Sequence, residues 1–472
     1  MMDEINDMVA EKQHPSFFHA ATCFMGVFLM ISIGLFVYEA SVHAVIFLAL
    51  IWVGVNAALL GHTFIEIRGM MNRGISNALP AIYIFLLIGM VIASFMQSGT
   101  VPSLIYYGLD LLNPAIFLAA GLVLCSLMSV ATGTSWGTVG TVGVVLIGIG
   151  ETMGIPLPIV AGMIVSGATF GDKLSPISDT TNLAAMSAGT NLYRHIYVML
   201  YTTVPTFLIV LVILIFLGLQ YAENPLPTDN IGEIKAALID TYQLNLLITL
   251  LPILLMFGLS MKRVSPEISM SSSILLAMVI AVLYQGKEAI DVLNALWQNT
   301  PGETGVESID ALLGRGGIYS MAWTLLLSIM ALALGGILHY AGFLRILLAR
   351  VVEGIKRISA LIATTILSGF FSNIAMGEAY ISIILNCQLF KDSYQKRGLD
   401  KAVLSRSVEE GSTMTTGLIP WTTAGAFYAA TLGVATLEYA PYAFLNLLNP
   451  IISVVMAILG IGLLRNVKKS GC

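Results

Sequence analysis

The sequence predicts an all-α polytopic membrane protein: about ten transmembrane helices plus two re-entrant hairpins in two inverted repeats, with broken helices at the midplane. Three observations carry this prediction. Of the 472 residues, 57% are hydrophobic and 10% are charged, whereas about 25% of the residues in soluble domains are charged. The charged residues fall mainly in short segments between long apolar stretches. The second half also repeats features of the first at a fixed offset of 244 residues.

This composition excludes a cytosolic enzyme, a nucleic-acid-binding protein and a disordered regulator, because each needs far more polar surface. The mean hydropathy is +0.88. The four cysteines, Cys23, Cys125, Cys387 and Cys472, form neither a disulfide framework nor a zinc pattern. The acidic residues 1–17 lack the basic region and cleavage site of a signal peptide, so we expect a retained cytoplasmic tail.

Eight stretches are long and apolar enough to be transmembrane helices, since one span needs about 20 apolar residues. They are 18–38, 42–60, 80–97, 196–218, 244–261, 268–284, 318–341 and 441–464. The stretches 156–190 and 403–430 are apolar but contain polar, Pro and Gly residues, which predicts two broken helices. Two further apolar stretches, 114–150 and 359–389, are interrupted in the middle.

Lys and Arg orient the chain because they concentrate in cytoplasmic loops. We assign the basic segments to the cytoplasm: 68–73, 194–195, 262–263, 345–357, 391–406 and the tail 465–472. The acidic segment 221–243 is expected to be an external linker, and the loop 285–317 is also mostly acidic. Both chain termini are then cytoplasmic.

The two interrupted stretches are expected to be hairpins that enter the membrane from opposite sides. Both flanks of 359–389 are basic and therefore cytoplasmic, and its polar interruption at 372–377 leaves arms of about 13 residues, too short to span. The flanks of 114–150 lack Lys and Arg, which predicts entry from outside, with the tip near 131–135. In the alternative interpretation, each arm is a tilted full span.

The offset of 244 residues aligns both the hairpins and the broken helices. It places Gly133 on Gly377 and Pro176 on Pro420, and it divides the chain into repeats 18–220 and 244–464. Each repeat contains five spans and one hairpin, and an odd number of spans inverts the second copy. Inverted repeats with interrupted helices near the midplane are typical of secondary transporters.

The densest polar cluster within the apolar sequence lies in the first broken helix, from Phe170 to Asn182. A charge at the bilayer centre costs about 2.5–3.5 kcal/mol on insertion scales, so such a cluster needs internal partners or a cation. Pro176 frees backbone carbonyls, and small hard cations bind carboxylate, hydroxyl, amide and carbonyl oxygens. The expected ion ligands in this cluster are Asp172, Ser175, Asp179, Thr180 and Asn182.

Lys173 has two interpretations. It can neutralise one carboxylate of the cluster when no ion is bound, or it can form a structural ion pair with Asp172 at the membrane surface.

The other three interruptions contribute further candidate ion or substrate ligands. They are Thr134 and Ser135 at the first hairpin tip, Asn373 and Glu378 at the second, and Thr413 and Thr422 in the second broken helix. The alternative at the first tip is helix packing by small residues. At the second, the alternative is that Glu378 is an acid facing a loop. In the second broken helix, Thr416 and Thr423 replace Asp172 and Asp179. Glu409 and Glu410 follow Arg406, and the alternative interpretation is that they pair with it near the cytoplasm.

A buried carboxylate that holds a cation in one state can hold a proton in another, which is a simple physical basis for cation/proton exchange. The candidate proton-coupling residues are Asp172, Asp179 and Glu378, and the candidate Na⁺ ligands are Asp172, Asp179 and Asn182.

Three motifs resemble those of the NhaC-type Na⁺/H⁺ antiporters of the ion-transporter superfamily. They are FGDKLSPISDTTNLA at 170–184, GTSWGT at 133–138, and EEGST at 409–413 followed by Pro420-Trp421. The chain departs from the family at 409–411, where Glu-Asp-Ser is more usual, and at Thr422, where Asn is frequent. The resemblance implies an elevator-like carrier built from inverted repeats, and it extends to sodium-coupled malate/lactate antiporters.

We therefore expect a secondary antiporter that exchanges Na⁺ for H⁺ by alternating access. The alternative is an organic-acid exchanger of the malate/lactate type, whose anion site would use hairpin amides, hydroxyls and Lys173. A channel and an intramembrane enzyme are two further classes, but the sequence has neither a His-Glu-x-x-His motif nor a Walker-type motif. We expect no enzymatic activity and no cofactor besides the transported Na⁺ and H⁺. We expect a plasma-membrane location. The expected partners are these ions, malate or lactate, the lipid bilayer and a second copy of the chain, with no nucleic acid.

Overall fold

The computed structural model describes residues 15–76, 79–111, 113–176, 178–221, 228–262, 264–302, 310, 313–353 and 355–464. All the regular elements in these ranges are helices. Most of the predicted N-terminal tail, the C-terminal tail 465–472 and residues 222–227 of the predicted linker lie outside the described residues.

The eight predicted continuous spans correspond to single helices or to pairs of consecutive helices. The single helices are α2 (Phe17–Phe36), α3 (Val42–Leu59), α5 (Leu79–Gln97), α12 (Leu192–Gln220), α16 (Pro266–Leu283) and α19 (Ile318–Tyr340). The pairs are α14 (Leu246–Thr249) with α15 (Leu251–Met261), and α25 (Thr436–Tyr439) with α26 (Phe444–Ile458). In the described part of the chain, 8 helices are long and apolar enough to cross a membrane. The number rises to as many as 11 if three sharply bent pairs, 82–97 with 100–108, 235–241 with 246–259 and 436–442 with 444–458, each count as one span. These lengths confirm a polytopic all-helical membrane protein.

Both predicted hairpins turn at a glycine in the left-handed region, which a residue with a Cβ adopts only under strain. The first consists of α7 (Pro114–Thr132), Gly133 with φ 72°, and an arm of α8 (Ser135–Thr138), the π-helix η1 (Val139–Gly143) and α9 (Val144–Thr152). The second consists of α21 (Ile358–Met376), Gly377 with φ 67°, and α22 (Ala379–Lys396).

The expected arm length of about 13 residues is wrong. Helices α7 and α21 have 19 residues each and α22 has 18. Helix α21 continues through the polar stretch because Asn373 donates its amide hydrogens to Ser412 O and Thr415 Oγ1 of a neighbouring helix. Each of α7 and α21 is long and apolar enough to span, so the alternative with full-span arms remains open.

Both predicted broken helices are present. The first comprises α10 (Leu157–Leu174) and α11 (Asp179–Ala188), and the second comprises α23 (Lys401–Thr416) and α24 (Thr423–Leu432). Each second segment has a side-chain N-cap. Ser178 Oγ accepts a hydrogen bond from Thr181 N, and Thr422 Oγ1 accepts one from Gly425 N.

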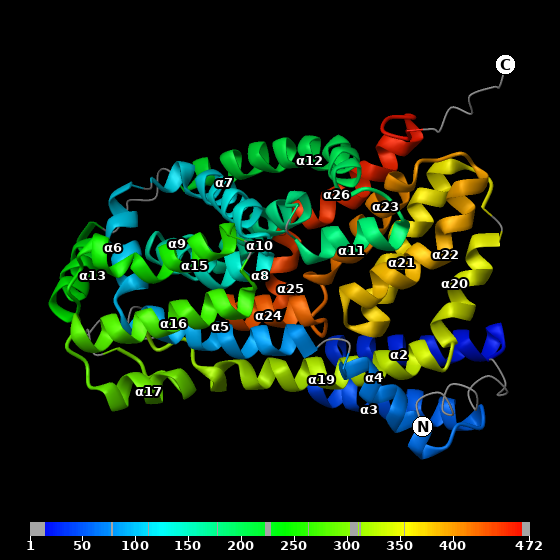
Figure 1. The fold of residues 1–472 in the computed structure, drawn as a ribbon, viewed down its shortest axis with the longest axis horizontal. Coiled ribbons are helices and arrows are strands. Elements are labelled where there is room, and N and C mark those ends of the chain that lie inside the picture. The colour runs from blue at the N-terminus through cyan, green and yellow to red at the C-terminus, as the bar shows by residue number, and fades with distance from the viewer. Residues whose placement is uncertain are drawn as a thin grey trace.

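Helix boundaries recur at the predicted offset. Helices α7 and α21 begin 244 residues apart and end 244 residues apart, and so do α11 and α24. The amphipathic helices α6 (Thr100–Leu111) and α20 (Phe343–Glu353), which the sequence analysis did not predict, lie at opposite ends of the molecule (Figure 1). The opposite orientation of the two repeats stays a prediction, with which this placement agrees.

The broken helices lie between two layers of helices (Figure 1). In one layer α19 packs against α3, α4 (Phe64–Ser76) and α5, while in the other α12 packs against α7 and α26. The remaining helices, α13 (Thr228–Thr241) and α17 (Ala289–Trp297), lie toward the same end as α6. This arrangement places the polar interruptions in the interior, where their side chains contact one another.

Candidate ion-binding site

The hairpin tips and the N-terminal ends of the helices that follow the breaks contribute side chains to one interior region. Ser135, at the start of α8, donates a hydrogen bond to Asp172 Oδ2 at 2.7 Å. Glu378 is the N-cap of α22, and its Oε2 accepts a hydrogen bond from Thr423 Oγ1 at 2.7 Å. Helix N-termini favour negative charge, so these positions suit carboxylates.

Asp172 and Glu378 line the same small cavity of about 40 Å³. Its lining also includes Ser135, Trp136, Thr169, Thr180, Ala379, Tyr380, Thr413, Thr416, Thr423, Ala424 and Tyr428. Two buried carboxylates that line so small a space are unfavourable as bare charges, because burial removes their hydration, unless a cation or a proton lies with them. The volume suits one small ion or one water molecule.

Two hydroxyls of this cavity lack a hydrogen-bond partner. Thr413 Oγ1 and Thr416 Oγ1 are buried and unpartnered in the described structure, although a buried hydroxyl normally forms a hydrogen bond. Hydroxyl and carboxylate oxygens are the ligands that hard cations prefer. The two carboxylates and these two hydroxyls are therefore oxygen donors of the kind that a small hard cation binds.

A second cavity of about 470 Å³ lies next to the first and shares Asp172 with it. It is lined by the first hairpin tip, including Thr134, and by Asp179 and Thr180 at the start of α11. Asp179 is an exposed side chain, whereas Asp172 is 8% exposed. Asp172 therefore lines both the large cavity and the small one.

The two halves differ at equivalent positions. In the first half the hairpin carries Thr134 and the helix after the break begins with Asp179, while in the second half these positions hold Glu378 and Thr423. Glu378 is 2% exposed and its tip is joined to α24 by Thr423 N donating to Gly377 O at 2.9 Å. The second tip is thus closed over the site, while the first tip borders the large cavity.

Four of the residues predicted as ligands form hydrogen bonds that hold the breaks in place and do not line either cavity. Ser175 Oγ donates to Val130 O at 2.7 Å, and Asn182 donates to Pro176 O and Ser178 O at 2.9 and 2.8 Å. Asn373 joins α21 to α23, and Thr422 caps α24 and donates to Ile419 O. The structure brings the other seven, Thr134, Ser135, Asp172, Asp179, Thr180, Glu378 and Thr413, to one or both cavities.

The expected pairing of Lys173 with Asp172 is wrong for this conformation. Lys173 is completely buried, and its Nζ lies 2.6 Å from Asn449 Oδ1 and 3.8 Å from Glu410 Oε1. Of the two proposed contacts with Arg406, the one with Glu410 is present at 3.9 Å between fully buried side chains, whereas Glu409 pairs with His195.

Several cavity residues were not predicted as ligands. Tyr428 donates from its hydroxyl to Ser135 Oγ at 3.0 Å, and Trp136 stacks on Phe427 with ring centroids 4.7 Å apart. Tyr380 lines both cavities. Two sequence signals pointed to Trp136 and Tyr380: the offset of 244 residues pairs them, and Trp136 lies in the GTSWGT motif at 133–138.

Comparison with known proteins agrees with this arrangement. The family model described as the Na⁺/H⁺ antiporter family matches residues 15–181 and 167–461. The Na⁺/H⁺ antiporter NhaC of Alkalihalophilus pseudofirmus is 37% identical over 93% of this chain and 95% of its own length. The malate-2H⁺/Na⁺-lactate antiporter of Bacillus subtilis is 36% identical over 89% of this chain and 90% of its own length. The Na⁺/H⁺ antiporter NhaC of the same organism is 35% identical over 89% of this chain and 93% of its own length. The chain therefore belongs to the Na⁺/H⁺ antiporter family.

Proposed function

We propose that the protein exchanges Na⁺ for H⁺ across the membrane, using Asp172 and Glu378 as the carboxylates that bind the ion. The observation that carries this proposal is the small cavity, which is lined by both carboxylates and by the unpartnered hydroxyls of Thr413 and Thr416. The NhaC relatives support the choice of Na⁺ and H⁺ as substrates, and membership of an antiporter family supports a transporter rather than an enzyme.

Exchange follows from competition at this cavity. Two ionised carboxylates in a water-poor space are unfavourable because they lose their hydration, and either one Na⁺ or one proton reduces this cost. The site is stable when it holds either Na⁺ or H⁺ and unstable when it is empty. Because the empty state is avoided, release of one ion is coupled to binding of the other. No cofactor takes part in this scheme.

We further propose that the conformation described here is open to the cytoplasm. The large cavity is lined by Val264, Ser265 and Pro266, which follow the basic pair Lys262-Arg263 assigned to the cytoplasm. In the opposite state, the first tip would close and the second would release Thr423. The same assignment places both termini in the cytoplasm of a plasma-membrane protein, and we expect a homodimer.

An organic-acid exchanger of the malate/lactate type is the second candidate. The cavity of about 470 Å³ has room for a small dicarboxylate, and the N-terminus of α11 points a partial positive charge toward it. One relative is a malate-2H⁺/Na⁺-lactate antiporter.

A proteoliposome assay distinguishes the two candidates. Vesicles containing the protein and a pH-sensitive dye receive Na⁺, Li⁺, K⁺ or malate in turn. We expect Na⁺ alone to dissipate the pH gradient and labelled malate not to accumulate. Malate uptake that requires Na⁺ would favour the second candidate, and no ion-dependent proton movement would contradict both.

Asp179→Asn is expected to weaken Na⁺ transport without abolishing it. Because Asp179 is exposed at the open cavity, removing its charge lowers Na⁺ attraction there by about 1 kcal/mol, or roughly five- to tenfold in apparent affinity. The measurement is the Na⁺ concentration for half-maximal proton release, with an unchanged maximal rate. Complete loss of exchange would instead make Asp179 a direct ligand.

A further inference from the structure

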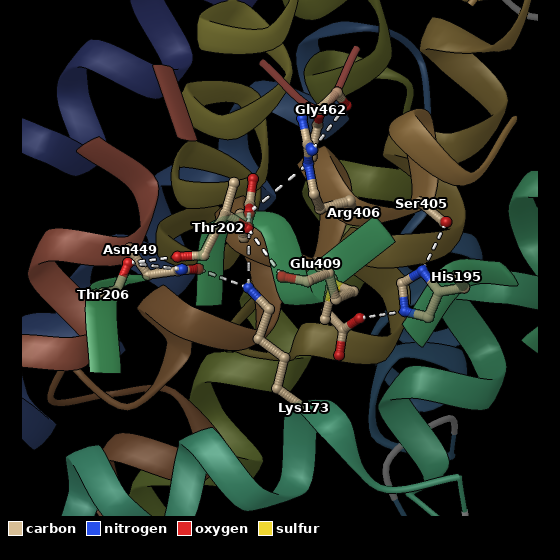
Figure 2. A network of polar contacts seen from close by, with 12 residues as sticks. Lys173, His195, Thr202, Thr206, Ser405, Arg406, Glu409, Asn449 and Gly462 are labelled. Carbon is tan, nitrogen blue, oxygen red and sulfur yellow. Dashed lines mark hydrogen bonds and ion pairs between the residues drawn. The ribbon is translucent and has the colours of Figure 1, made fainter. Parts of the chain in front are cut away.

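A second group of buried titratable side chains lies outside both cavities. Helices α10, α12 and α23 contribute Lys173, His195, Arg406, Glu409 and Glu410, and all five are 0% exposed (Figure 2). The proposed exchange at Asp172 and Glu378 uses none of them. Burying five ionisable side chains costs free energy, which points to a function for them.

His195 has polar partners at both ring nitrogens. Its Nε2 lies 2.6 Å from Glu409 Oε2, and its Nδ1 lies 2.7 Å from Ser405 Oγ. Figure 2 shows the ring held between these two residues of α23. The arrangement resembles the way an acid and a hydroxyl orient a histidine that takes up protons.

The Ser405 hydroxyl has two possible acceptors, His195 Nδ1 at 2.7 Å and Ala402 O at 3.0 Å. When His195 is neutral with the proton on Nε2, that N–H donates to Glu409 and Ser405 donates to Nδ1. When His195 is protonated, both nitrogens donate, and Ser405 accepts from Nδ1 and turns its own hydrogen to Ala402 O. Every polar atom of His195 is therefore satisfied in both states without movement of a heavy atom.

We propose that His195, held between Glu409 and Ser405, is a binding site for one proton, separate from the cation site at Asp172 and Glu378. Formation of the site requires only that a proton adds to Nδ1 as the Ser405 hydroxyl rotates. The proton binding does not depend on the proposed exchange.

The charged groups around His195 come from several helices. On α23, Arg406, Glu409 and Glu410 face the network, and α10 adds Lys173. The other charged residue of α10, Asp172, belongs to the cation site and lies close enough to feel the charge of Glu409. With neutral His195, two cations and two carboxylates balance, and protonation gives the group a net charge of +1. Of the other helices packed on α12, α7 and α26 carry no charged residue, and α11 carries only the exposed Asp179. At the cytoplasmic end predicted for α12, Arg194 pairs with Asp400 at 3.0 Å.

A physical connection links this site to the cation site. Thr181 Oγ1 lies 3.2 Å from Glu409 Oε1 and also 3.2 Å from the backbone oxygens of Asp172 and Lys173. An added positive charge at His195 disfavours a cation at Asp172 by Coulomb's law. Na⁺ binding therefore strengthens as pH rises and His195 loses its proton.

Nitrogen-15 NMR of histidine-labelled protein in lipid nanodiscs tests the site. The chain has six histidines, and the His195 resonance is the one lost in His195→Gln or, if that variant does not fold, the one displaced by Ser405→Ala. In Na⁺-free buffer we expect one protonated and one bare nitrogen at high pH, and two protonated nitrogens at low pH. A His195 signal that does not change between pH 5 and 9 would overturn the proposal.

A matched pair of serine variants tests the hydroxyl rotation. Ser405→Ala removes the acceptor of the charged Nδ1–H, so the titration midpoint should fall by about one pH unit, roughly tenfold in proton affinity. Ser407→Ala is the control, because this buried hydroxyl on the same helix donates to Val403 O. Equal shifts in both variants would contradict the proposal.

Transport gives an independent second measurement. If the protein exchanges Na⁺ for H⁺, the pH profile of exchange in Ser405→Ala should move about one unit toward acid, and that of Ser407→Ala should not. A titrating His195 in a protein without exchange would refute the proposed function and leave the proton site intact. An unmoved exchange profile in Ser405→Ala, despite a shifted titration, would contradict the link to the cation site.

Discussion

Asp172→Asn is expected to abolish Na⁺/H⁺ exchange. Asp172 lines both the large cavity and the small one, and it is one of the two carboxylates proposed to bind the ion. Removing one member of a buried charge interaction costs about 2–5 kcal/mol, which corresponds to roughly 30- to 4,000-fold in ion affinity. The measurement is Na⁺-dependent dequenching in proteoliposomes.

The variant should still fold, because Asn keeps the shape of Asp and retains an oxygen for the hydrogen bond from Ser135. Asp291→Asn is the matched control, since Asp291 is an exposed carboxylate in the first turn of α17. We expect the control to exchange Na⁺ at the wild-type rate. Exchange above a tenth of the wild-type rate in Asp172→Asn would contradict the assignment of Asp172 as an ion ligand.

The position of the breaks could be predicted from the sequence because their causes are local. Pro176 and Pro420 interrupt hydrogen bonding in the helix, and Ser178 and Thr422 supply the caps that start the next segments. The offset of 244 residues aligns both breaks and both tips of the two halves from the sequence alone. Two of the three carboxylates predicted for ion coupling, Asp172 and Glu378, line one small cavity.

The partners of buried charges could not be predicted in the same way. Asp172 and Lys173 are neighbours in the sequence, but successive residues of an α-helix project about 100° apart. Asp172 therefore contacts Ser135 of the first hairpin, while Lys173 contacts Asn449 of α26. Those partners depend on how distant helices pack, and no spacing in the sequence records that. Asn182 likewise donates to the backbone oxygens of Pro176 and Ser178 at the break rather than lining a cavity.

The predicted lengths of the hairpin arms were wrong for a related reason. Ser372 and Asn373 were interpreted as an interruption because polar residues are costly in a membrane helix. In the structure, Asn386 Nδ2 donates to Ser372 Oγ, and Asn373 donates to α23, so the helix continues to Met376. The composition of one segment could not reveal that a neighbouring helix provides these partners.

Glu378→Gln is expected to reduce Na⁺/H⁺ exchange by about 10- to 100-fold, because one of the two carboxylates of the small cavity loses its charge. The alternative explanation of Glu378 is structural, since its side chain also caps α22 through the backbone N–H of Tyr380. Gln is a poor N-cap residue, so this variant alone does not separate the loss of charge from the loss of the cap.

A pair of shorter side chains separates the two roles. Asp and Asn have the same size and both are good N-caps, so Glu378→Asp and Glu378→Asn differ chiefly in charge. Both lack one methylene and reach less far toward Thr423, which donates to Glu378 Oε2 at 2.7 Å. If the carboxylate binds the ion, the Asp variant should exchange Na⁺ at least tenfold faster than the Asn variant.

The outcome also tests the closure of the second hairpin. Thr423→Ala removes the hydroxyl that joins Glu378 to α24 and leaves the carboxylate charge in place. We expect it to retain exchange at a reduced rate, because Thr423 N still donates to Gly377 O. If Glu378→Asp and Glu378→Asn are equally active, Glu378 acts only as a cap. The exchange of H⁺ for Na⁺ must then depend on Asp172 alone, since no other carboxylate lines the small cavity within the described residues.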